Sequence, residues 1–387
     1  MTGLPPPPAD ALVLGERLAQ QIRDEALAEG GVLPFSRYME LCLYSPGLGY
    51  YSAGLQKFGA AGDFVTAPEI SPLFGRCLAR SCATVLQACD GDILEIGAGS
   101  GRLAVDLLAG LEQLDRLPGR YLILERSSDL RERQRSLLGS ELPHLAGRVA
   151  WLDELPVGFR GAVLANEVLD AMPVERFRWD GEQVGRLCMH ETGGRFEWTP
   201  CTATPSGLSS VMQPICEQYR LAPGYVSEVN LSLPAWLQGL AQMLEQGMLL
   251  LADYGYPRRE YYHPQRSQGT LMCHYRHQTH DDPFVWPGLQ DLTAHVDFTA
   301  VAEAASASGL DVAGYTTQAA FLLDCGLEQL LQAQGEPAST AYLRAVQQVK
   351  TLIMPGEMGE RFKFIALTKD LDRAIPGFRM QDMRERL

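Results

Sequence analysis

The sequence predicts a doubly wound α/β fold, in which helices cover both faces of a mostly parallel β-sheet. Short apolar runs end in small or acidic residues, as is typical of strands buried on both faces of a parallel sheet. These runs are DILEI, YLILE, VAWL, GAVLAN and MLLLADYG. Helical patterns follow the first two runs, and this alternation of strand and helix predicts right-handed crossovers within one sheet.

Apolar residues at helical spacing follow the first two predicted strands, and each set keeps one face of a helix. The first set is Leu103, Ala104, Leu107, Leu108 and Leu111, and the second is Leu130, Leu137 and Leu138. A further helical region is expected from about Ala11 to Leu43. Within it, Ser36 is a candidate cap for a helix that carries Met39, Cys42 and Leu43 on one face.

Four consecutive segments are expected along the chain. Residues 1–90 form an N-terminal helical and lid segment, because the stretch from Ser45 to Pro72 is too long and too aromatic for a simple linker. Residues 91–172 form a Rossmann-like half of the main domain. In residues 173–246 the alternation stops, and DG and GG pairs predict an inserted antiparallel element followed by helices. Residues 247–387 return to the sheet, with FKFIALTK as a closing strand.

Composition and charge exclude several classes of protein. Hydrophobic residues make up 46% of the chain, and no apolar stretch is long enough to insert into a membrane. The net charge of −14 disfavours the basic surface that binds nucleic acid. The nine cysteines are scattered and include no C-x-x-C, which predicts reduced thiols that fill the core of a cytoplasmic protein.

The most specific local motif is the loop from Glu95 to Gly101, EIGAGSG, between a predicted strand and a predicted helix. Its glycines let the backbone turn tightly and approach a ligand closely. A dinucleotide loop of the form G-x-G-x-x-G would need glycine at Arg102, and a nucleophile elbow would need glycine at Ala98. The spacing instead fits E/D-x-G-x-G-x-G, the loop of enzymes that bind S-adenosylmethionine (SAM), with Gly97, Gly99 and Gly101 as its glycines.

Polar residues after the next strands complete the expected cofactor site. Glu125 ends the run YLILE, where an acid is placed to accept hydrogen bonds from both ribose hydroxyls. Asp153 follows the run VAWL and is expected to face the adenine amine, as acids do there in similar enzymes. Asn166, at the end of GAVLAN, is assigned to the same site.

The chain resembles the MidA family of class I methyltransferases over about Phe35 to Lys369. The resemblance rests on SPGLGYY, GDFVTAPEIS, ILEIGAGSGRLA, NEVLDAMPV, LADYG, GLQDLTAHVDF and MGERFKFIALTK, in this order. It implies a seven-stranded class I methyltransferase sheet and SAM-dependent methylation of an arginine in a partner protein to symmetric dimethylarginine. Mitochondrial members are respiratory complex I assembly factors, so the implied partner is a subunit of an NADH dehydrogenase of that type.

Carboxylates are the residues expected to act on such an arginine. A guanidinium is positive at any working pH, and a carboxylate can hold its planar fork, orient one nitrogen and accept the departing proton. Glu167 and Asp170 lie just beyond the strand GAVLAN, and Glu69 lies in the lid segment. These three residues are the candidate catalytic groups, although Asp170 could instead cap a turn and Glu69 could be an exposed loop charge.

Histidines and aspartates in a later loop are the last candidates. His277, Asp291, His295 and Asp297 match positions of the family and are assigned by the resemblance to the substrate wall. The spacing of His274, His277 and His280 allows a metal site on a helix. Methyl transfer to nitrogen needs no metal, however, and nearby glycine and proline residues favour an irregular loop, so no metal is expected.

Two other functions are compatible with the same motifs. One is methylation of a small molecule or RNA, which the acidic composition and the inserted segment disfavour. The other is a non-catalytic assembly factor that uses a SAM-bound fold to hold a client, which the intact glycine loop and Glu167 disfavour. The sequence leaves the oligomeric state open.

Overall fold

A computed structural model describes residues 4–52 and 65–387 of the chain. The chain forms two compact units, each assembled from three stretches of sequence. Unit 1 contains the described residues of Met1–Phe64 together with Asp170–Leu233 and Arg258–His295. Unit 2 contains Val65–Leu169, Pro234–Pro257 and Val296–Leu387. The boundaries of these units differ from the four consecutive segments that the sequence suggests.

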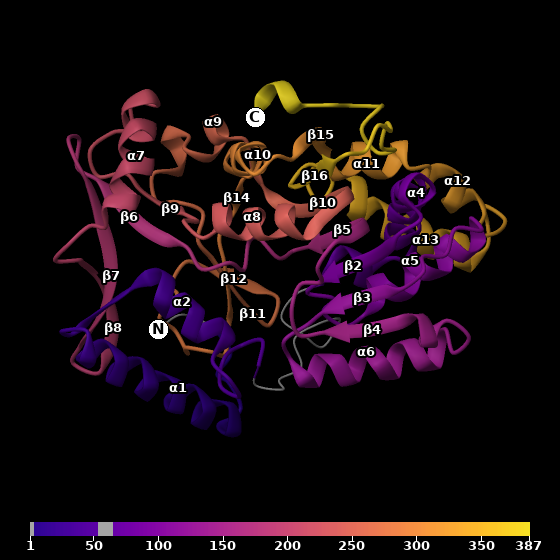
Figure 1. Ribbon diagram of the computed structural model, residues 1–387. Coiled ribbons are helices and arrows are strands. Elements are labelled where there is room, and N and C mark those ends of the chain that lie inside the picture. The colour runs from indigo at the N-terminus through magenta and orange to yellow at the C-terminus, as the bar shows by residue number, and fades with distance from the viewer. Residues whose placement is uncertain (1–3, 53–64) are drawn as a thin grey trace. The chain divides into compact units, whose positions relative to one another are not determined.

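Unit 2 holds the large sheet, whose parallel centre is visible in Figure 1. Along the sheet the order is β15-β16-β10-β5-β2-β3-β4, and β14 pairs with β10. The strands are β2 (Asp92–Ile96), β3 (Tyr121–Leu124), β4 (Val149–Leu152), β5 (Phe159–Asn166), β10 (Leu244–Tyr256), β14 (Val296–Asp297), β15 (Asp311–Thr317) and β16 (Phe362–Lys369). All five expected runs and the closing strand FKFIALTK are therefore confirmed as strands.

The sheet is mixed, and in the described part of the chain it has one strand more than the seven expected. The five strands from β10 to β4 are parallel to their neighbours, whereas β16 runs antiparallel to both β10 and β15. In the described part of the chain the sheet contains eight strands, because the two-residue strand β14 adds to the edge of β10. A strand that short has no periodicity of its own for the sequence to reveal.

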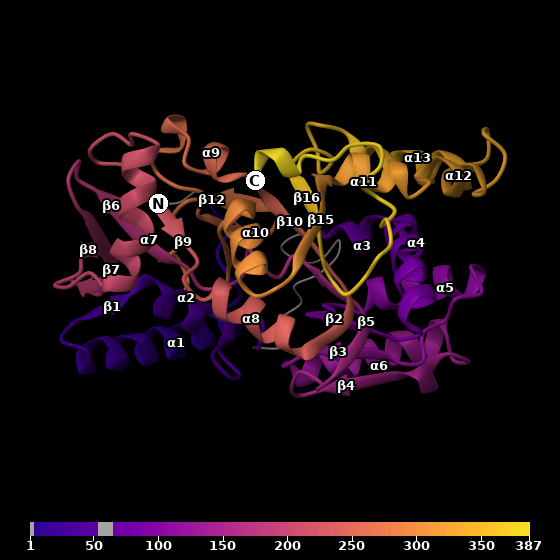
Figure 2. The same ribbon diagram turned by 45° about the horizontal axis from the view of Figure 1, so that its top comes forward.

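Helices of unit 2 cover the sheet, and Figure 2 shows α4, α5 and α6 beside its parallel strands. The helices are α3 (Ala67–Ile70), α4 (Pro72–Cys89), α5 (Arg102–Gln113), α6 (Ser128–Glu141), α8 (Leu233–Met243), α10 (Phe298–Ala307), α11 (Gln318–Asp324), α12 (Leu327–Gln332) and α13 (Thr340–Ile353). The two helices expected after Gly101 and Glu125 are confirmed as α5 and α6. Leu78 of α4, Leu107 of α5 and Ile93 of β2 belong to one buried cluster, so helix and sheet share a core.

Unit 1 consists of two smaller antiparallel sheets with helices. The five-stranded sheet has the order β1-β7-β6-β9, with β8 on β7, and the three-stranded sheet has the order β12-β11-β13. Its strands are β1 (Val32–Pro34), β6 (Glu175–Trp179), β7 (Val184–Thr192), β8 (Arg195–Pro200), β9 (Val226–Val229), β11 (Met272–Tyr275), β12 (Gln278–His280) and β13 (Asp291–Thr293). Its helices are α1 (Ala9–Ala28), α2 (Phe35–Tyr44), α7 (Ser206–Gln218) and α9 (Arg258–Tyr261). The DG and GG pairs lie between β6 and β7 and between β7 and β8, as expected.

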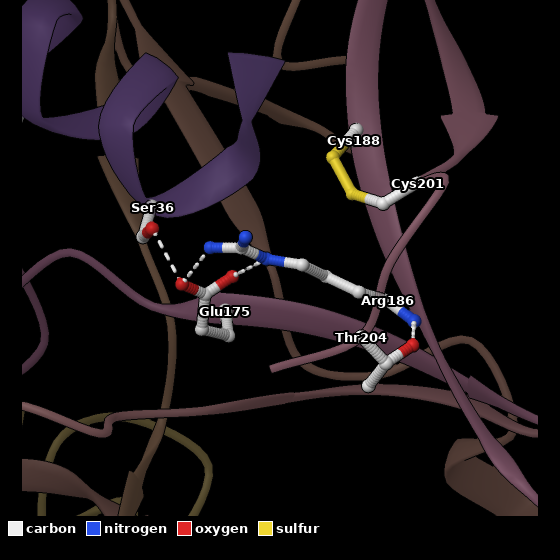
Figure 3. The surroundings of a disulfide bond; sticks show 6 residues. All are labelled: Ser36, Glu175, Arg186, Cys188, Cys201 and Thr204. Atoms are coloured by element: carbon white, nitrogen blue, oxygen red, sulfur yellow. Dashed lines mark hydrogen bonds and ion pairs between the residues drawn. A yellow bond between two sulfur atoms is a disulfide. The ribbon is translucent and has the colours of Figure 1, made fainter. Parts of the chain in front are cut away.

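The N-terminal helical region differs from the expectation in two ways. It is interrupted by β1, because Gly30 and Gly31 adopt φ values of 85° and 91° at the end of α1. Ser36 does not cap α2, which begins one residue earlier, after Pro34. The Ser36 hydroxyl instead donates a 2.7 Å hydrogen bond to Glu175 of β6 (Figure 3). Met39, Cys42 and Leu43, the expected apolar face, are all buried.

Two of the nine cysteines form a disulfide, which corrects the expectation of reduced thiols. Cys188 on β7 and Cys201, just after β8, are bonded, with 5.4 Å between their Cα atoms (Figure 3). The hairpin makes this possible, because Cys188 pairs with Thr199 and the Cys201 amide donates to the Arg186 carbonyl. The other seven cysteines are free and buried, as expected of core residues.

Within residues 4–52 and 65–387, no helix is both long enough and apolar enough to cross a membrane.

Candidate functional site

The glycine loop joins β2 to α5 and has the backbone that its sequence suggests. Gly97, Gly99 and Gly101 adopt φ values of 67°, 54° and 88°, in the left-handed region that side chains with a Cβ rarely enter. A Cβ at Gly97 would lie 3.3 Å from a methyl group of Val168, and one at Gly101 would lie 3.2 Å from Gln134. The loop therefore depends on glycine, and it ends at the N-terminus of α5, where the helix dipole favours a negatively charged ligand group.

Glu95 lies beneath this loop as a buried carboxyl group. It accepts a 2.6 Å hydrogen bond from the hydroxyl of Tyr121 on β3. The pKa of Glu95 is raised to about 7, because burial and, to a smaller extent, the nearby Glu125 raise it by more than the hydrogen bond from Tyr121 lowers it. Glu95 is thus close to half-protonated near neutral pH, and its carboxyl group joins β2 to β3 at the start of the loop.

Glu125 follows β3, at the carboxyl end of the strand, as expected for a ribose-binding acid. Its side chain accepts hydrogen bonds from the Ser127 amide at 3.0 Å and from the Gln134 amide group at 3.3 Å. Burial raises the pKa of the Glu125 carboxyl, and these hydrogen bonds lower it. The carboxylate is held in one orientation at the edge of the sheet where ligands of open α/β folds bind.

Gln134 of α6 was not among the residues predicted from the sequence. Its side-chain NH2 group donates to the Gly99 carbonyl at 2.9 Å and to Glu125, and its oxygen accepts from the Trp151 indole at 2.8 Å. It is fully buried, so it ties the glycine loop, Glu125 and β4 together. One sequence feature could have revealed it, because Gln134 interrupts the apolar face between Leu130 and Leu138.

The end of β5 carries Asn166 and Glu167. Glu167 adopts a φ of 52°, uncommon for a residue with a side chain, and its amide donates to the Ala252 carbonyl of β10 at 2.9 Å. The Asn166 amide group donates to a Glu167 carboxylate oxygen at 3.1 Å. The Asn166 side-chain oxygen is buried without a hydrogen-bond partner in the described chain. A buried acceptor left this way is where a ligand N–H group would fit.

A second residue that the sequence analysis missed holds the turn after Glu167. Asp253 of β10 is almost fully buried, and one of its carboxylate oxygens accepts the Leu169 amide at 2.9 Å. Its other oxygen accepts the Tyr254 amide. Asp253 lies in the motif LADYG, and an acid at the end of an apolar strand was a signal that could have identified it.

Asp153 and Glu69 have surroundings unlike those of the other predicted acids. The Asp153 side chain is 87% exposed and pairs with Arg131 at 2.7 Å. Glu69 of α3 accepts a hydrogen bond from the Ser100 hydroxyl of the glycine loop. Glu69 and Ser100 also line a surface cavity of about 500 Å³ with Arg102 and residues of α6. Residues 53–64 of the expected lid lie outside the described part of the chain.

The expected substrate wall is divided between the two units. His277, Asp291 and His295 belong to unit 1, whereas Asp297 belongs to unit 2, where it caps α10 by accepting the amides of Thr299 and Ala300. Asp291 is buried on β13, and the His295 amide donates to the Thr270 hydroxyl at 3.2 Å. His277 lies in the exposed turn between β11 and β12, with a φ of 61°.

The histidines of this region lie on a β-hairpin and not on a helix. His274 is on β11, His280 is on β12, and His277 is in the turn between them. Burial, together with His280, lowers the pKa of His274 to about 4, so its ring is neutral at physiological pH. Among the described residues, no three side chains of the metal-binding types are grouped to hold an ion.

Comparison with known proteins gives one consistent answer. The model of a family of S-adenosyl-L-methionine-dependent methyltransferases matches residues 77–316. The mitochondrial protein arginine methyltransferase NDUFAF7 homolog of Drosophila melanogaster is 31% identical, over 90% of this chain and 84% of its own. The mouse protein arginine methyltransferase NDUFAF7 is 30% identical, over 87% of this chain and 81% of its own.

A solved structure of a bacterial relative shares the whole fold. A COG1565 superfamily member from Burkholderia thailandensis, crystallised with S-adenosyl-homocysteine, is 44% identical and superposes with a TM-score of 0.95. The match covers 100% of both chains. Family model, curated relatives and solved structure agree, and the chain therefore belongs to this family of S-adenosyl-L-methionine-dependent methyltransferases.

Proposed function

We propose that this protein methylates an arginine side chain of a partner protein and produces symmetric dimethylarginine. The observation that carries the proposal is Glu167, a carboxylate held in a rare backbone conformation directly after β5. Rare conformations of this kind cost about 1–3 kcal/mol and cluster at functional sites. The names of the curated relatives, which are protein arginine methyltransferases, support the same reaction.

The residues of unit 2 fit the cofactor SAM. The left-handed glycines leave loop backbone accessible to its amino-acid part, Glu125 is oriented to accept from ribose hydroxyls, and the buried Asn166 oxygen suits an N–H donor. Gln134 holds the loop and Glu125 in place, and Glu95 at the start of the loop is bonded to Tyr121 of β3. When bound, SAM supplies a methyl group that is activated by the positive charge of its sulfonium.

Glu167 then performs the part of the reaction that falls to the protein. Its carboxylate accepts two N–H groups of a guanidinium in the bidentate geometry that Arg–carboxylate pairs favour. The Asn166 bond fixes the carboxylate, so one guanidinium nitrogen is presented in a defined direction. A Glu167 oxygen also accepts the proton that this nitrogen loses. Asp170, three residues further along the chain, is proposed as the second carboxylate.

For Glu69, Asp153 and Asp297 we propose supporting roles, in which they stabilise segments around the site. The bond from Ser100 makes Glu69 a support for the glycine loop, and Asp297 stabilises α10. Asp153 pairs with Arg131, whose guanidinium also donates to the Glu125 carbonyl, so Asp153 supports the same edge of the sheet.

We further propose that the client is a subunit of an NADH dehydrogenase of the complex I type, as the resemblance to the MidA family implies. A cytoplasmic location stays a prediction, and the curated relatives are named as mitochondrial. Small-molecule or RNA methylation and a purely assembly-related role are the competing functions. An oriented carboxylate beside the SAM-binding residues favours catalysis over a purely assembly-related role, and the names of the curated relatives favour arginine over a small molecule or RNA.

The variant Glu167→Gln tests the proposal. Protein extract from cells that lack the enzyme is incubated with labelled SAM and the purified variant, and dimethylarginine is measured after hydrolysis. We expect a loss of roughly 100-fold to 1,000-fold, as for other preorganised electrostatic contacts. Affinity for S-adenosyl-homocysteine, measured by calorimetry, should stay unchanged because Glu167 is not among the residues assigned to the cofactor.

The matched control is Glu132→Gln, an exposed glutamate of α6, which should retain full activity. Dimethylarginine at the wild-type level in Glu167→Gln would remove the assigned role of Glu167. No dimethylarginine with the wild-type enzyme would reject arginine as the substrate. Mass spectrometry of the complex I subunits from cells with and without the enzyme tests the client.

A further inference from the structure

A chain of buried hydrogen bonds connects the indole of Trp151 to the glycine loop. Trp151 is the third residue of β4, which pairs with β3, and α6 lies beside both strands (Figure 1). Its indole N–H donates to the side-chain oxygen of Gln134 on α6 at 2.8 Å. The NH2 group of Gln134 donates in turn to the Gly99 carbonyl at 2.9 Å and to the Glu125 carboxylate at 3.3 Å. All four residues lie within unit 2.

Trp151 fixes the orientation of the Gln134 amide. A glutamine side chain has an acceptor oxygen on one side and an NH2 donor on the other, whereas an indole N–H can only donate. The bond from Trp151 therefore holds the oxygen toward β4 and directs the NH2 group toward Gly99 and Glu125. A rotated amide would place its oxygen against a carbonyl and a carboxylate. Because Gln134 is fully buried, solvent cannot compensate for that loss.

Glu125 is held by α6 through both its side chain and its main chain. One carboxylate oxygen accepts the Ser127 amide at 3.0 Å, and the other accepts the NH2 group of Gln134. The Glu125 carbonyl accepts from the guanidinium of Arg131 at 2.6 Å. Arg131 and Gln134 are three residues apart, on one face of α6. One helix thus determines where this carboxylate lies and which way it points.

The glycine loop rests on the same residue. A Cβ at Gly101 would lie 3.2 Å from Cγ of Gln134 and 3.3 Å from its Cα, so the loop packs directly against α6. The peptide bond between Gly99 and Ser100 is trans, so the Ser100 N–H points the opposite way from the Gly99 carbonyl. By accepting from Gln134, that carbonyl sets the direction of an N–H donor on the side of the loop away from α6.

We propose that Trp151 and Gln134 are positioning residues for the cofactor, in which Trp151 orients the Gln134 amide and Gln134 fixes the glycine loop and Glu125 in one arrangement. This inference rests on the proposed assignment of the loop to the amino-acid part of SAM and of Glu125 to its ribose. One amide then connects the groups that hold the two ends of the cofactor. Binding is tighter because these groups are already ordered in the unliganded protein.

The test measures the affinity of the unliganded protein for S-adenosyl-homocysteine by calorimetry. Gln134→Met keeps the length of the side chain and removes all three hydrogen bonds, so we expect the affinity to fall about 10-fold to 50-fold. Trp151→Phe removes only the orienting donor and should lower the affinity about threefold to fivefold. The double variant should match Gln134→Met within twofold, because Trp151 has no amide left to orient.

The matched control is Gln318→Met, in a different part of unit 2. Gln318 of α11 is also fully buried, and its NH2 group donates to the Leu352 carbonyl of α13 at 2.9 Å. In denaturant this variant should lose stability as Gln134→Met does, yet it should keep the wild-type affinity within twofold. Trp151→Phe keeps an aromatic ring beneath Arg135, whose guanidinium lies 4.7 Å from the ring centre. It stays decisive if Gln134→Met does not fold.

The outcomes separate this inference from the assignments on which it rests. Wild-type affinity in Gln134→Met or in Trp151→Phe would overturn the role of that residue. An equal loss from Trp151→Phe in the wild-type and Gln134→Met backgrounds would overturn the orienting role, because Trp151 would then act through packing. A similar affinity loss in Gln318→Met would do the same for Gln134. Wild-type affinity in Glu125→Ala would reject the ribose assignment. A wild-type enzyme that makes no dimethylarginine rejects only the proposed reaction, since the calorimetry uses no protein substrate.

Discussion

Glu95 is an ionisable residue that is buried in the core of the folded protein. It is the first residue of the glycine loop motif and it is buried next to a second carboxylate, Glu125. The Tyr121 hydroxyl stabilises its charged form, but burial has the larger effect and raises its pKa to about 7. The residue is therefore neutral at mildly acidic pH and charged in the core at alkaline pH.

This arrangement predicts a stability that falls as the pH rises. Between the ordinary pKa of 4.5 and the folded value of about 7, the folded chain binds a proton that the unfolded chain has lost. The free energy of unfolding therefore decreases across this window, by on the order of 3 kcal/mol for this residue. Glu95→Gln, which cannot ionise, should lack this decrease and should be more stable than the wild type at pH 8.

Denaturant unfolding at pH 4, 6 and 8 measures the effect. The difference between Glu95→Gln and the wild type should be smallest at pH 4 and largest at pH 8. A difference that is independent of pH would show that Glu95 titrates normally in the folded state. Glu132→Gln is again the matched control, since its exposed side chain should show no such trend.

The positions of candidate site residues could be predicted from the sequence where these residues come directly after a strand. The glycine loop, Glu125 and Glu167 each come directly after a strand, and the strands can be located from their hydrophobic periodicity. Gln134 of α6 contacts the glycine loop and Asp253 of β10 contacts the turn after Glu167. A local pattern can mark each residue as unusual, but it does not say which distant segment the residue contacts.

At the scale of elements, the hairpin of β7 and β8 shows why the cysteine content led to a wrong prediction about disulfides. Scattered cysteines suggested reduced thiols, but an antiparallel hairpin places Cys188 and Cys201 on neighbouring strands. Close by, Glu175 of β6 binds both Arg186 of β7 and Ser36 of α2 (Figure 3). The hairpin is thus joined to its sheet by an ion pair and closed by a covalent bond.

The disulfide predicts a specific chemical count and a response to reductant. Alkylation of the denatured, unreduced chain should modify seven cysteines, and prior reduction should raise the number to nine. Because the bond closes a short loop, with a sequence separation of 13, reduction should lower stability by about 3 kcal/mol. Mass spectrometry gives the count, and thermal unfolding with and without dithiothreitol gives the stability.

The double variant Cys188→Ser/Cys201→Ser is the control for this experiment. It should unfold at the same temperature with and without reductant, whereas Cys216→Ser should keep the wild-type response because Cys216 is free. Nine modified cysteines in the unreduced chain would contradict the disulfide.

Strands and helices that are long enough to show a hydrophobic periodicity could be predicted, whereas short elements between them could not. The five apolar runs, α5 and α6 follow from hydrophobic periodicity alone. β1 could not be predicted, because a strand of three residues has no periodicity, and it forms because β7, more than 150 residues further along the chain, pairs with it. Ser36 shows the same limit, since a distant partner, Glu175, uses the hydroxyl that a local rule assigns to a helix cap.

For the whole molecule, the discontinuity of the units makes a prediction about fragments. The fragment of residues 65–169 contains the glycine loop, Glu125, Gln134 and Glu167, yet it lacks β10. Without β10, β5 becomes an open edge, and the amides of Glu167 and Leu169 lose Ala252 and Asp253 as acceptors. We expect this fragment to aggregate and to bind no S-adenosyl-homocysteine.

Co-expression with residues 170–387 should restore binding if the pieces assemble. Circular dichroism and calorimetry on the fragment and on the assembled pair measure the result. A fragment that unfolds cooperatively and binds S-adenosyl-homocysteine as tightly as the full chain does would show that the first stretch of unit 2 is self-sufficient.

The same discontinuity also decides when this protein can fold during its synthesis. Chains emerge from ribosomes at about 5–20 residues per second. Apolar residues of α1 and α2 share a core with Leu271, Cys273 and Leu292, so their partners are made long after them. For about 10 to 50 seconds at this rate the N-terminal helices are outside the ribosome without a complete core to enter, and during that time their apolar faces are exposed to aggregation or to chaperones.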